Sequence, residues 1–178
     1  MFNSKTKKLA MDSMLAAMCA VLGYLSLDFG NLKITFESVP ILLGALLLGP
    51  VDGMAIGGVG TLLYQLVRYG VSLTTPLWIL PYVLCGLVVG AGAARQGFHP
   101  GRRESTVLIV SGELLITLLN TVTRYIDSKL YGYYYPGLIL APLALRLAIC
   151  VGKSAVFSAV LPQLAGSVGR VLSPRKSR

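Results

Sequence analysis

The stretch ELLITLLNTVTRYIDSKLYGYYYPG, residues Glu113 to Gly137, decides how this chain folds. It begins as an apolar segment in which polar residues recur seven, four and three positions apart: Glu113, Asn120, Arg124 and Asp127. At about 3.6 residues per turn these residues share one face of a helix, and the opposite face is leucine and valine. A polar stripe on such a helix is costly unless it faces a protein interior or a water-filled cavity. The stripe therefore favours a ligand cavity, with polar groups that only hold helices together as the alternative.

The composition of the whole chain is that of a membrane protein. Its 178 residues are 54% hydrophobic and 13% charged, and the mean hydropathy is +0.71. These values exclude a disordered chain and argue against a water-soluble globule. Because one membrane span needs roughly 20 apolar residues, the length fits about six spans with short connections. We therefore predict an all-α integral membrane protein with six transmembrane helices in a single compact bundle. Residues 1–178 form one domain in this prediction, with short basic tails at about 1–8 and 169–178.

The apolar runs give the expected helices. They cover about residues 9–27, 39–48, 51–67, 76–94, 105–130 and 137–160. The second run is too short to cross a membrane alone, so it starts near Phe36 or spans only part of the bilayer. Gly49-Pro50 separates the second run from the third, whose glycines form a bare flank suited to close packing. The segment 28–37 is polar and extended in character.

Basic residues set the expected orientation in the membrane. With six spans, one side holds Lys5, Lys7, Lys8, Arg95, Arg102, Arg103, Arg170, Arg175, Lys176 and Arg178. The other side holds only Lys33, Arg68, Arg124 and Lys129. Since Lys and Arg gather on the cytoplasmic side, we predict a multi-pass protein of the cell membrane with both termini in the cytoplasm. The formal charge of +9 is explained by this topology, and we expect no nucleic-acid partner.

This topology gathers polar and aromatic residues from separate spans in the outer half of the bilayer. The candidate ligand-binding residues are Gln65, Arg68, Tyr69, Trp78, Tyr82, Asn120, Arg124, Tyr125 and Asp127, with Lys33 as a further cation from the loop above them. For Trp78 or any one tyrosine, an interfacial aromatic belt is the alternative. Together, the residues indicate a binding cavity open to the exterior, with the loop Asp28–Glu37 as its lid.

Catalytic and metal-binding patterns are weak in this sequence. Gly152-Lys153-Ser154 resembles the end of a phosphate-binding loop, but Leu147 occupies the position of its first glycine. The three cysteines have no CxxC spacing, and His99 is the only histidine. We therefore expect neither an enzyme, nor a metal site, nor a cofactor in this chain. Any active transport has to be powered by a partner or by an ion gradient.

Four stretches resemble one family, the substrate-binding (S) components of energy-coupling factor (ECF) vitamin transporters. Two are Ala16-x-x-x-Ala20 and KITFESVPILLGALLLGPVDGMAIG at Lys33–Gly57. The others, TPLWILPYVLCGLVVG at Thr75–Gly90 and ELLITLLNTVTRYIDSKLYGYY at Glu113–Tyr134, look like the folate branch. The resemblance implies an importer subunit that captures a vitamin outside the cell. It implies assembly with a membrane-embedded coupling (T) subunit and two cytoplasmic ATPases, which use the ATP. It also implies that the component topples in the lipid bilayer to release the vitamin inside.

The resemblance assigns roles to further residues. Ala16 and Ala20 match the pair that contacts the T subunit. The loop over the site matches a gate, with Asp28, Gly30, Asn31, Leu32, Thr35 and Phe36 as its residues. Riboflavin, thiamine or a queuosine precursor remain alternatives to folate, and a membrane protein whose polar stripe only mediates assembly is the alternative from another class.

The side-chain chemistry agrees with a pterin vitamin. Trp78, Tyr82 or Tyr69 could stack on the flat ring. Asn120 or Gln65 could read its edge, because an amide both donates and accepts hydrogen bonds. Arg68, Arg124 or Lys33 could meet a carboxylate of the glutamate tail. For Glu113 and Arg146, a mutual buried ion pair is preferred over direct contact with the ligand.

Overall fold

The computed structural model describes residues 4–29, 32–98 and 101–172, and within these ranges the chain forms six helices and one short two-stranded ribbon. The helices are α1 (Ser4–Tyr24), α2 (Ser38–Leu48), α3 (Pro50–Tyr69), α4 (Thr75–Arg95), α5 (Arg102–Leu130) and α6 (Pro136–Leu172). The strands β1 (Leu27–Phe29) and β2 (Leu32–Ile34) pair antiparallel with Asp28 opposite Lys33. The predicted class, a six-helix membrane bundle, is confirmed. The extended loop before α2 proves to contain this ribbon.

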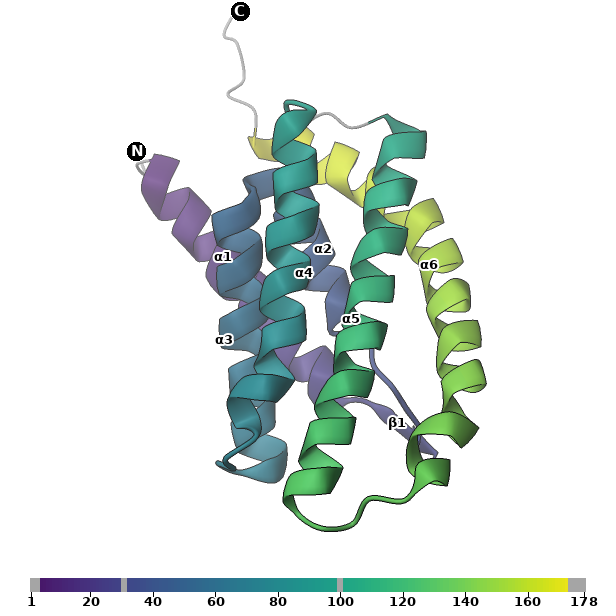
Figure 1. Ribbon diagram of the computed structural model, residues 1–178. Coiled ribbons are helices and arrows are strands. Elements are labelled where there is room, and N and C mark those ends of the chain that lie inside the picture. Colours follow the sequence, from purple (N-terminus) through teal and green to yellow (C-terminus); the bar gives the residue numbers. More distant parts are fainter. Residues whose placement is uncertain (1–3, 30–31, 99–100, 173–178) are drawn as a thin grey trace, which may run out of the picture.

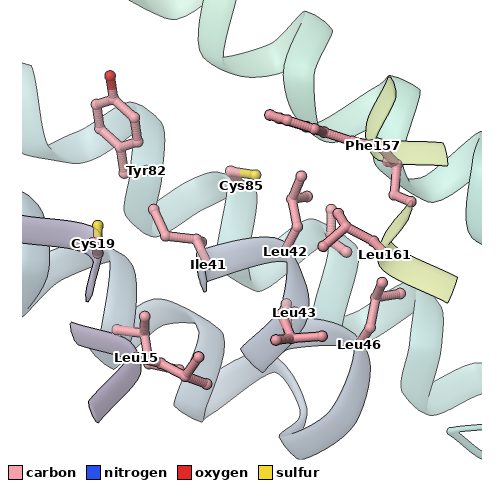
Figure 2. Close-up of a cluster of buried hydrophobic side chains, with 14 of the residues drawn as sticks. Leu15, Cys19, Ile41, Leu42, Leu43, Leu46, Tyr82, Cys85, Phe157 and Leu161 are labelled. Atoms are coloured by element: carbon pink, nitrogen blue, oxygen red, sulfur yellow. The ribbon is translucent and has the colours of Figure 1, made fainter. Parts of the chain in front are cut away.

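Within the described ranges, three helices are long and apolar enough to cross a membrane by themselves: α4, α5 and most of α6. The short helix α2 lies inside the bundle instead. Its eleven residues reach only about 16 Å, roughly half the thickness of the bilayer's hydrocarbon core. Ile41, Leu42 and Ala45 of α2 are completely buried. Figure 2 shows Ile41 and Leu42 between Leu15 and Cys19 of α1 on one side and Leu161 of α6 on the other.

Glycines let α3 approach its neighbours closely, as the bare flank of the third apolar run predicts. A Cβ atom on Gly86 of α4 would lie 2.3 Å from the carbonyl group of Gly53 on α3. A Cβ atom on Gly60 would lie 2.9 Å from the backbone oxygen of Ala16 on α1. Both distances are too short for any side chain, so these helices meet backbone to backbone.

The break between α2 and α3 also depends on glycine. Gly49 has a φ of 110°, a conformation that residues with a Cβ rarely adopt, and Pro50 then starts α3. The chain can therefore leave the buried α2 and turn directly into the longer α3.

The last helix is longer than its sequence predicts. We expected it to end near residue 160, but α6 continues to Leu172 with Pro162 inside it. Proline removes one backbone hydrogen bond and bends a helix. Figure 1 shows the last part of α6, in yellow, turning across the end of the bundle.

The two ends of the bundle differ in what they carry. The start of α1 and the end of α6 lie toward one end, together with the turn between α4 and α5 (Figure 1). The connections α3–α4 and α5–α6 lie at the opposite end, with the ribbon near it. The odd and even helices therefore run in the directions that the six-span prediction requires.

Candidate functional site

A cavity of about 450 Å³ opens within the half of the bundle that ends at the α3–α4 and α5–α6 connections. Its walls come from the second half of α3, the first half of α4, the second half of α5 and the first half of α6, with Ile34, Thr35 and Glu37 beside them. Small-molecule sites in proteins occupy about 300–1,000 Å³, so the cavity has room for one vitamin-sized ligand.

The polar stripe of α5 faces this cavity. Glu113, Asn120, Arg124 and Asp127 all line it. On the opposite face of α5, Leu114, Leu118 and Val122 are exposed, as expected for residues that face lipid. The helical spacing of the stripe thus predicted correctly which face of α5 points inward.

Most candidate ligand-binding residues meet around the cavity. Beyond the stripe, the predicted residues that line it are Gln65, Tyr69, Trp78, Tyr82 and, from the gate, Thr35. These residues come from segments far apart in sequence, so the fold brings together what the topology argument placed at one depth.

Three candidates lie elsewhere. Arg68 donates hydrogen bonds to the backbone oxygen of Tyr24 (2.9 Å) and to Oγ of Ser26 (2.7 Å), joining α3 to the end of α1. Tyr125 is half-exposed and packs edge-to-face on Tyr134, with ring centres 5.3 Å apart. Neither lines the cavity. Phe36 of the gate packs edge-to-face on Phe157 instead.

The rest of the predicted gate is described only in part. Asp28 and Leu32 lie in the paired strands, as does the candidate cation Lys33, and only their backbone is described. Gly30 and Asn31 lie outside the described residues. The roles of these five residues therefore stay predictions.

Asp127 ties together the two connections at the mouth of the cavity. Its Oδ1 accepts a 2.6 Å hydrogen bond from Thr74, just before α4, and its Oδ2 accepts one from the hydroxyl of Tyr133, just after α5. Partial burial and this hydrogen bond raise the pKa of Tyr133 to about 12. Asp127 is thus a structural acceptor that shapes the mouth, rather than a carboxylate pointing at open space.

Glu37 is a buried cavity residue that sequence reasoning missed. Its Oε1 accepts hydrogen bonds from the hydroxyl of Tyr82 and from Thr35 (3.0 Å). Asn120 in turn donates to the oxygen of Tyr82 at 3.3 Å. The signal was present in the sequence, because a carboxylate directly before a fully apolar helix has to be paired if that helix is buried.

Glu113 does not pair with Arg146, so that prediction is wrong. The carboxylate of Glu113 contacts Nζ of Lys153 at 2.9 Å, and Lys153 also donates to Oγ of Ser38 at 3.3 Å. Arg146 lies two turns before Lys153 on α6 and donates to Oγ1 of Thr121 at 3.4 Å. Both cations lie on one face of α6, and sequence periodicity alone could not tell which of them is level with Glu113.

The charges around the cavity fall into two groups. The lining carboxylates, Glu37, Glu113 and Asp127, each already accept hydrogen bonds from protein side chains. The lining cations are Arg124, Arg146 and Lys153, of which Arg146 and Lys153 also donate to protein oxygens. An arginine can hold a carboxylate through two parallel hydrogen bonds, so Arg124 and Arg146 are suited to an anionic part of a ligand.

The α1 pair predicted to contact a partner subunit has a different environment from the one expected. Ala16 is only 7% exposed and lies where α1 meets Gly60 of α3, and Ala20 is half-buried. Ala10, Ser13 and Ala17 are exposed small residues of α1, at a spacing of three and four that puts them on one face of the helix. The exposed surface of α1 also carries Met14 and Met18, so it offers small and apolar side chains side by side.

The three cysteines are free and buried. Among the described residues, no three His, Cys, Asp or Glu side chains lie close enough together to hold a metal ion. The cavity instead offers aromatic rings, amides, hydroxyl groups and guanidinium groups, which are the means of binding a polar organic molecule.

A helical membrane bundle with such a cavity near one end defines a small-molecule-binding membrane protein. The model of the family described as "ECF transporter, substrate-specific component" matches residues 7–165, so the chain belongs to this family. It is therefore the substrate-binding component of a vitamin importer, and not an enzyme.

Solved structures agree on the fold. The crystal structure of an S-component for biotin from an ECF-type ABC transporter is 15% identical, with a TM-score of 0.68 over 92% of this chain and 94% of that one. The S component of a bacterial ECF transporter is 21% identical, with a TM-score of 0.65 over 96% of this chain and 99% of that one. A comparison with curated protein sequences gives no significant match.

Proposed function

We propose that this S component binds folate or a closely related pterin vitamin and delivers it for ATP-driven import. The observation that carries the proposal is the convergence of flat aromatic, amide and guanidinium side chains on one cavity of about 450 Å³. A pterin vitamin needs all three, because it combines a planar ring, a hydrogen-bonding edge and an anionic tail.

The aromatic side chains supply the ring contacts. Trp78, Tyr69 and Tyr82 line the cavity from α3 and α4, opposite the stripe of α5. Each ring contact contributes about 0.5–1.5 kcal/mol beyond the burial of apolar surface. Tyr82 is held by Glu37 and Asn120, so its ring is fixed before any ligand arrives.

We assign the glutamate tail of the vitamin to the mouth of the cavity. Arg124 lies one turn from Asp127, whose partners Thr74 and Tyr133 belong to the two connections at the open end. An arginine can hold a carboxylate through two parallel hydrogen bonds. A glutamate tail that reaches Arg124 would leave the ring in the deeper part of the cavity.

Transport requires partners that this chain does not contain. We infer that a membrane T subunit and two cytoplasmic ATPases complete the importer, and that both termini face the cytoplasm. The basic residues support this orientation. The start of α1, the end of α4 and the start of α5 lie toward the end of the bundle opposite the cavity, and they carry Lys5, Lys7, Lys8, Arg95, Arg102 and Arg103. The cavity then faces the exterior, where the vitamin is captured.

The experiment is a binding isotherm on purified protein in detergent, without ATP. Folate should bind with an affinity in the nanomolar range and raise the melting temperature, because a ligand that binds only the folded state stabilises it. Riboflavin, thiamine and a queuosine precursor serve as competitors. Binding of one of these in place of folate would reject the pterin assignment and leave the transport class intact.

A further inference from the structure

One oxygen atom on the floor of the cavity has no hydrogen-bond partner. Glu113 is only 1% exposed and lines the cavity at the deep end of the α5 stripe. Its Oε2 contacts Lys153, but its Oε1 has no partner among the described residues. Buried polar atoms are nearly always paired in native proteins, so such an atom beside a cavity calls for a group that enters it.

The neighbours of Glu113 fix the carboxylate in place. Lys153 holds it at 2.9 Å and is itself anchored to Ser38 of α2 at 3.3 Å. The ammonium group has three protons, and these two contacts use two of them. The pair therefore presents a carboxylate acceptor beside an ammonium donor, both at a fixed position in the cavity wall.

The pterin ring carries the complementary edge. Its 2-amino group and its N3–H are neighbouring donors, and its 4-oxo group is an acceptor beside them. A carboxylate can accept from two adjacent donors through its two oxygens, since it has about four lone-pair positions. An amide such as Asn120 offers one acceptor atom, and it already donates to Tyr82. Glu113 therefore fits the donor pair better than the amides do.

We propose that Glu113 and Lys153 form the specificity-determining subsite for the 2-amino-4-oxo edge of a pterin. Glu113 accepts from the 2-amino group and N3–H, and Lys153 donates to the 4-oxo oxygen. The proposal rests on the proposed function and deepens it by placing the ring at the floor of the cavity.

The spacing along α5 agrees with this placement. Glu113 and Arg124 are eleven residues apart, which is about 17 Å along the helix axis. Both residues line the same cavity. An elongated ligand could therefore contact Glu113 with its ring and Arg124 with its tail at the same time.

The test measures how much the protein prefers folate over an analogue in which a methyl group replaces the 2-amino group. The wild-type protein should prefer folate by about tenfold to a hundredfold, since the analogue leaves a buried carboxylate oxygen unpaired. Glu113→Gln should weaken this preference, because its amide keeps only one acceptor oxygen and its NH₂ group opposes one of the two donors of the ring. The matched control is Glu104→Gln, an exposed residue at the far end of α5, which should keep the full preference.

Removing one charge of a buried pair can unfold a protein, so a double variant is included. Glu113→Gln combined with Lys153→Met removes both charges, and it should prefer folate less than the wild-type protein does. A wild-type protein that binds both ligands equally, or Glu113 variants that prefer folate as strongly as the wild-type protein does, overturns the subsite. A wild-type protein that binds no folate overturns the proposed function and the subsite with it.

Discussion

The two halves of the bundle are built from the same helices but filled differently. In the packed half, which contains α2 and the adjoining parts of α4 and α5, apolar residues such as Leu42, Val89 and Ile109 are completely buried. In the hollow half, the same α4 and α5 carry Trp78, Tyr82, Asn120 and Asp127 around a cavity. Tyr82 lies at the boundary, because it belongs to the apolar cluster (Figure 2) and its hydroxyl donates a hydrogen bond to Glu37.

The difference shows how a small membrane protein makes room for a ligand. Glycines bring α3 and α4 into backbone contact in the packed half, as at Gly53 and Gly86. In the hollow half, buried polar groups hold the helices at the distance that their hydrogen bonds require, as Asp127 does between Thr74 and Tyr133. Stability should therefore depend most on the first half and ligand affinity on the second.

The largest effect is expected in the packed half. Gly86→Ala places a Cβ atom 2.3 Å from the backbone of Gly53 and has to push α3 and α4 apart. We expect a loss of about 2–4 kcal/mol in the free energy of unfolding. Thermal melting in detergent measures it. The control is Gly152→Ala in α6, where a Cβ atom meets nothing within 4 Å, and it should stabilise the helix by about 0.5–1 kcal/mol. Equal melting temperatures for the two variants would refute the close packing.

The outer surface of the packed half should matter for transport but not for binding. Ala17→Trp adds a large side chain on the exposed face of α1, and we expect vitamin uptake by the assembled importer to be lost while the affinity for folate stays unchanged. Val107→Trp, on the exposed face of α5, is the matched control and should leave both unchanged. Normal uptake by the Ala17 variant would exclude this face as the contact with the T subunit.

In the hollow half, Arg124→Ala should weaken folate binding by roughly tenfold to a hundredfold, because the variant loses charge-assisted hydrogen bonds to the tail. The melting temperature of the free protein should change little by comparison. Isothermal titration measures the affinity, and Arg103→Ala at the opposite end of the bundle is the control. An unchanged dissociation constant would remove Arg124 from the site.

The smallest effect is expected at the mouth. Asp127→Asn keeps one acceptor for Thr74 but loses the charged acceptor of the Tyr133 hydroxyl. We therefore expect the free energy of unfolding to fall by about 1 kcal/mol. The pKa of Tyr133 should fall from about 12 toward its ordinary value of 10.0. In the wild-type protein, the neutral phenol is favoured by folding, so its contribution to stability is complete below pH 10 and is lost as the pH rises toward 12. Phenolate absorbance against pH, compared with Tyr133→Phe, reports the shift. A Tyr133 pKa that does not respond to Asp127→Asn would contradict the contact.

Much of the fold could be predicted because hydrophobic length and helical periodicity dominate in a membrane. The inward face of α5 followed from the spacing of Glu113, Asn120, Arg124 and Asp127. The end of α6 did not, since Pro162 reads as a helix stop and in fact lies within the helix. The burial of Ala16 was not predicted either, because Ala16 and Ala17 are adjacent and only tertiary packing shows which of them is buried. The role of Ala16 and Ala20 at the T subunit stays a prediction.

The site residues that spacing within one helix defines were predicted correctly. The contacts that depend on the relative height of two neighbouring helices were missed. Asn120 and Trp78 were found from their position along separate spans. The partner of Glu113 was misassigned because Arg146 and Lys153 differ by two turns along α6, and no sequence pattern fixes the relative height of α5 and α6. Arg68 looked like a ligand contact but caps the end of α1 instead.

The most direct test of the central claim uses the fluorescence of Trp78, which is the only tryptophan in the chain and lines the cavity. Folate added to the purified protein without ATP should change this fluorescence in a saturable way, with one molecule bound per chain and a midpoint in the nanomolar range. Glu104→Gln should give the same curve and Arg124→Ala a curve shifted to higher concentration. A fluorescence signal that does not respond to folate, while another vitamin saturates it, would contradict the assignment of this cavity to a pterin.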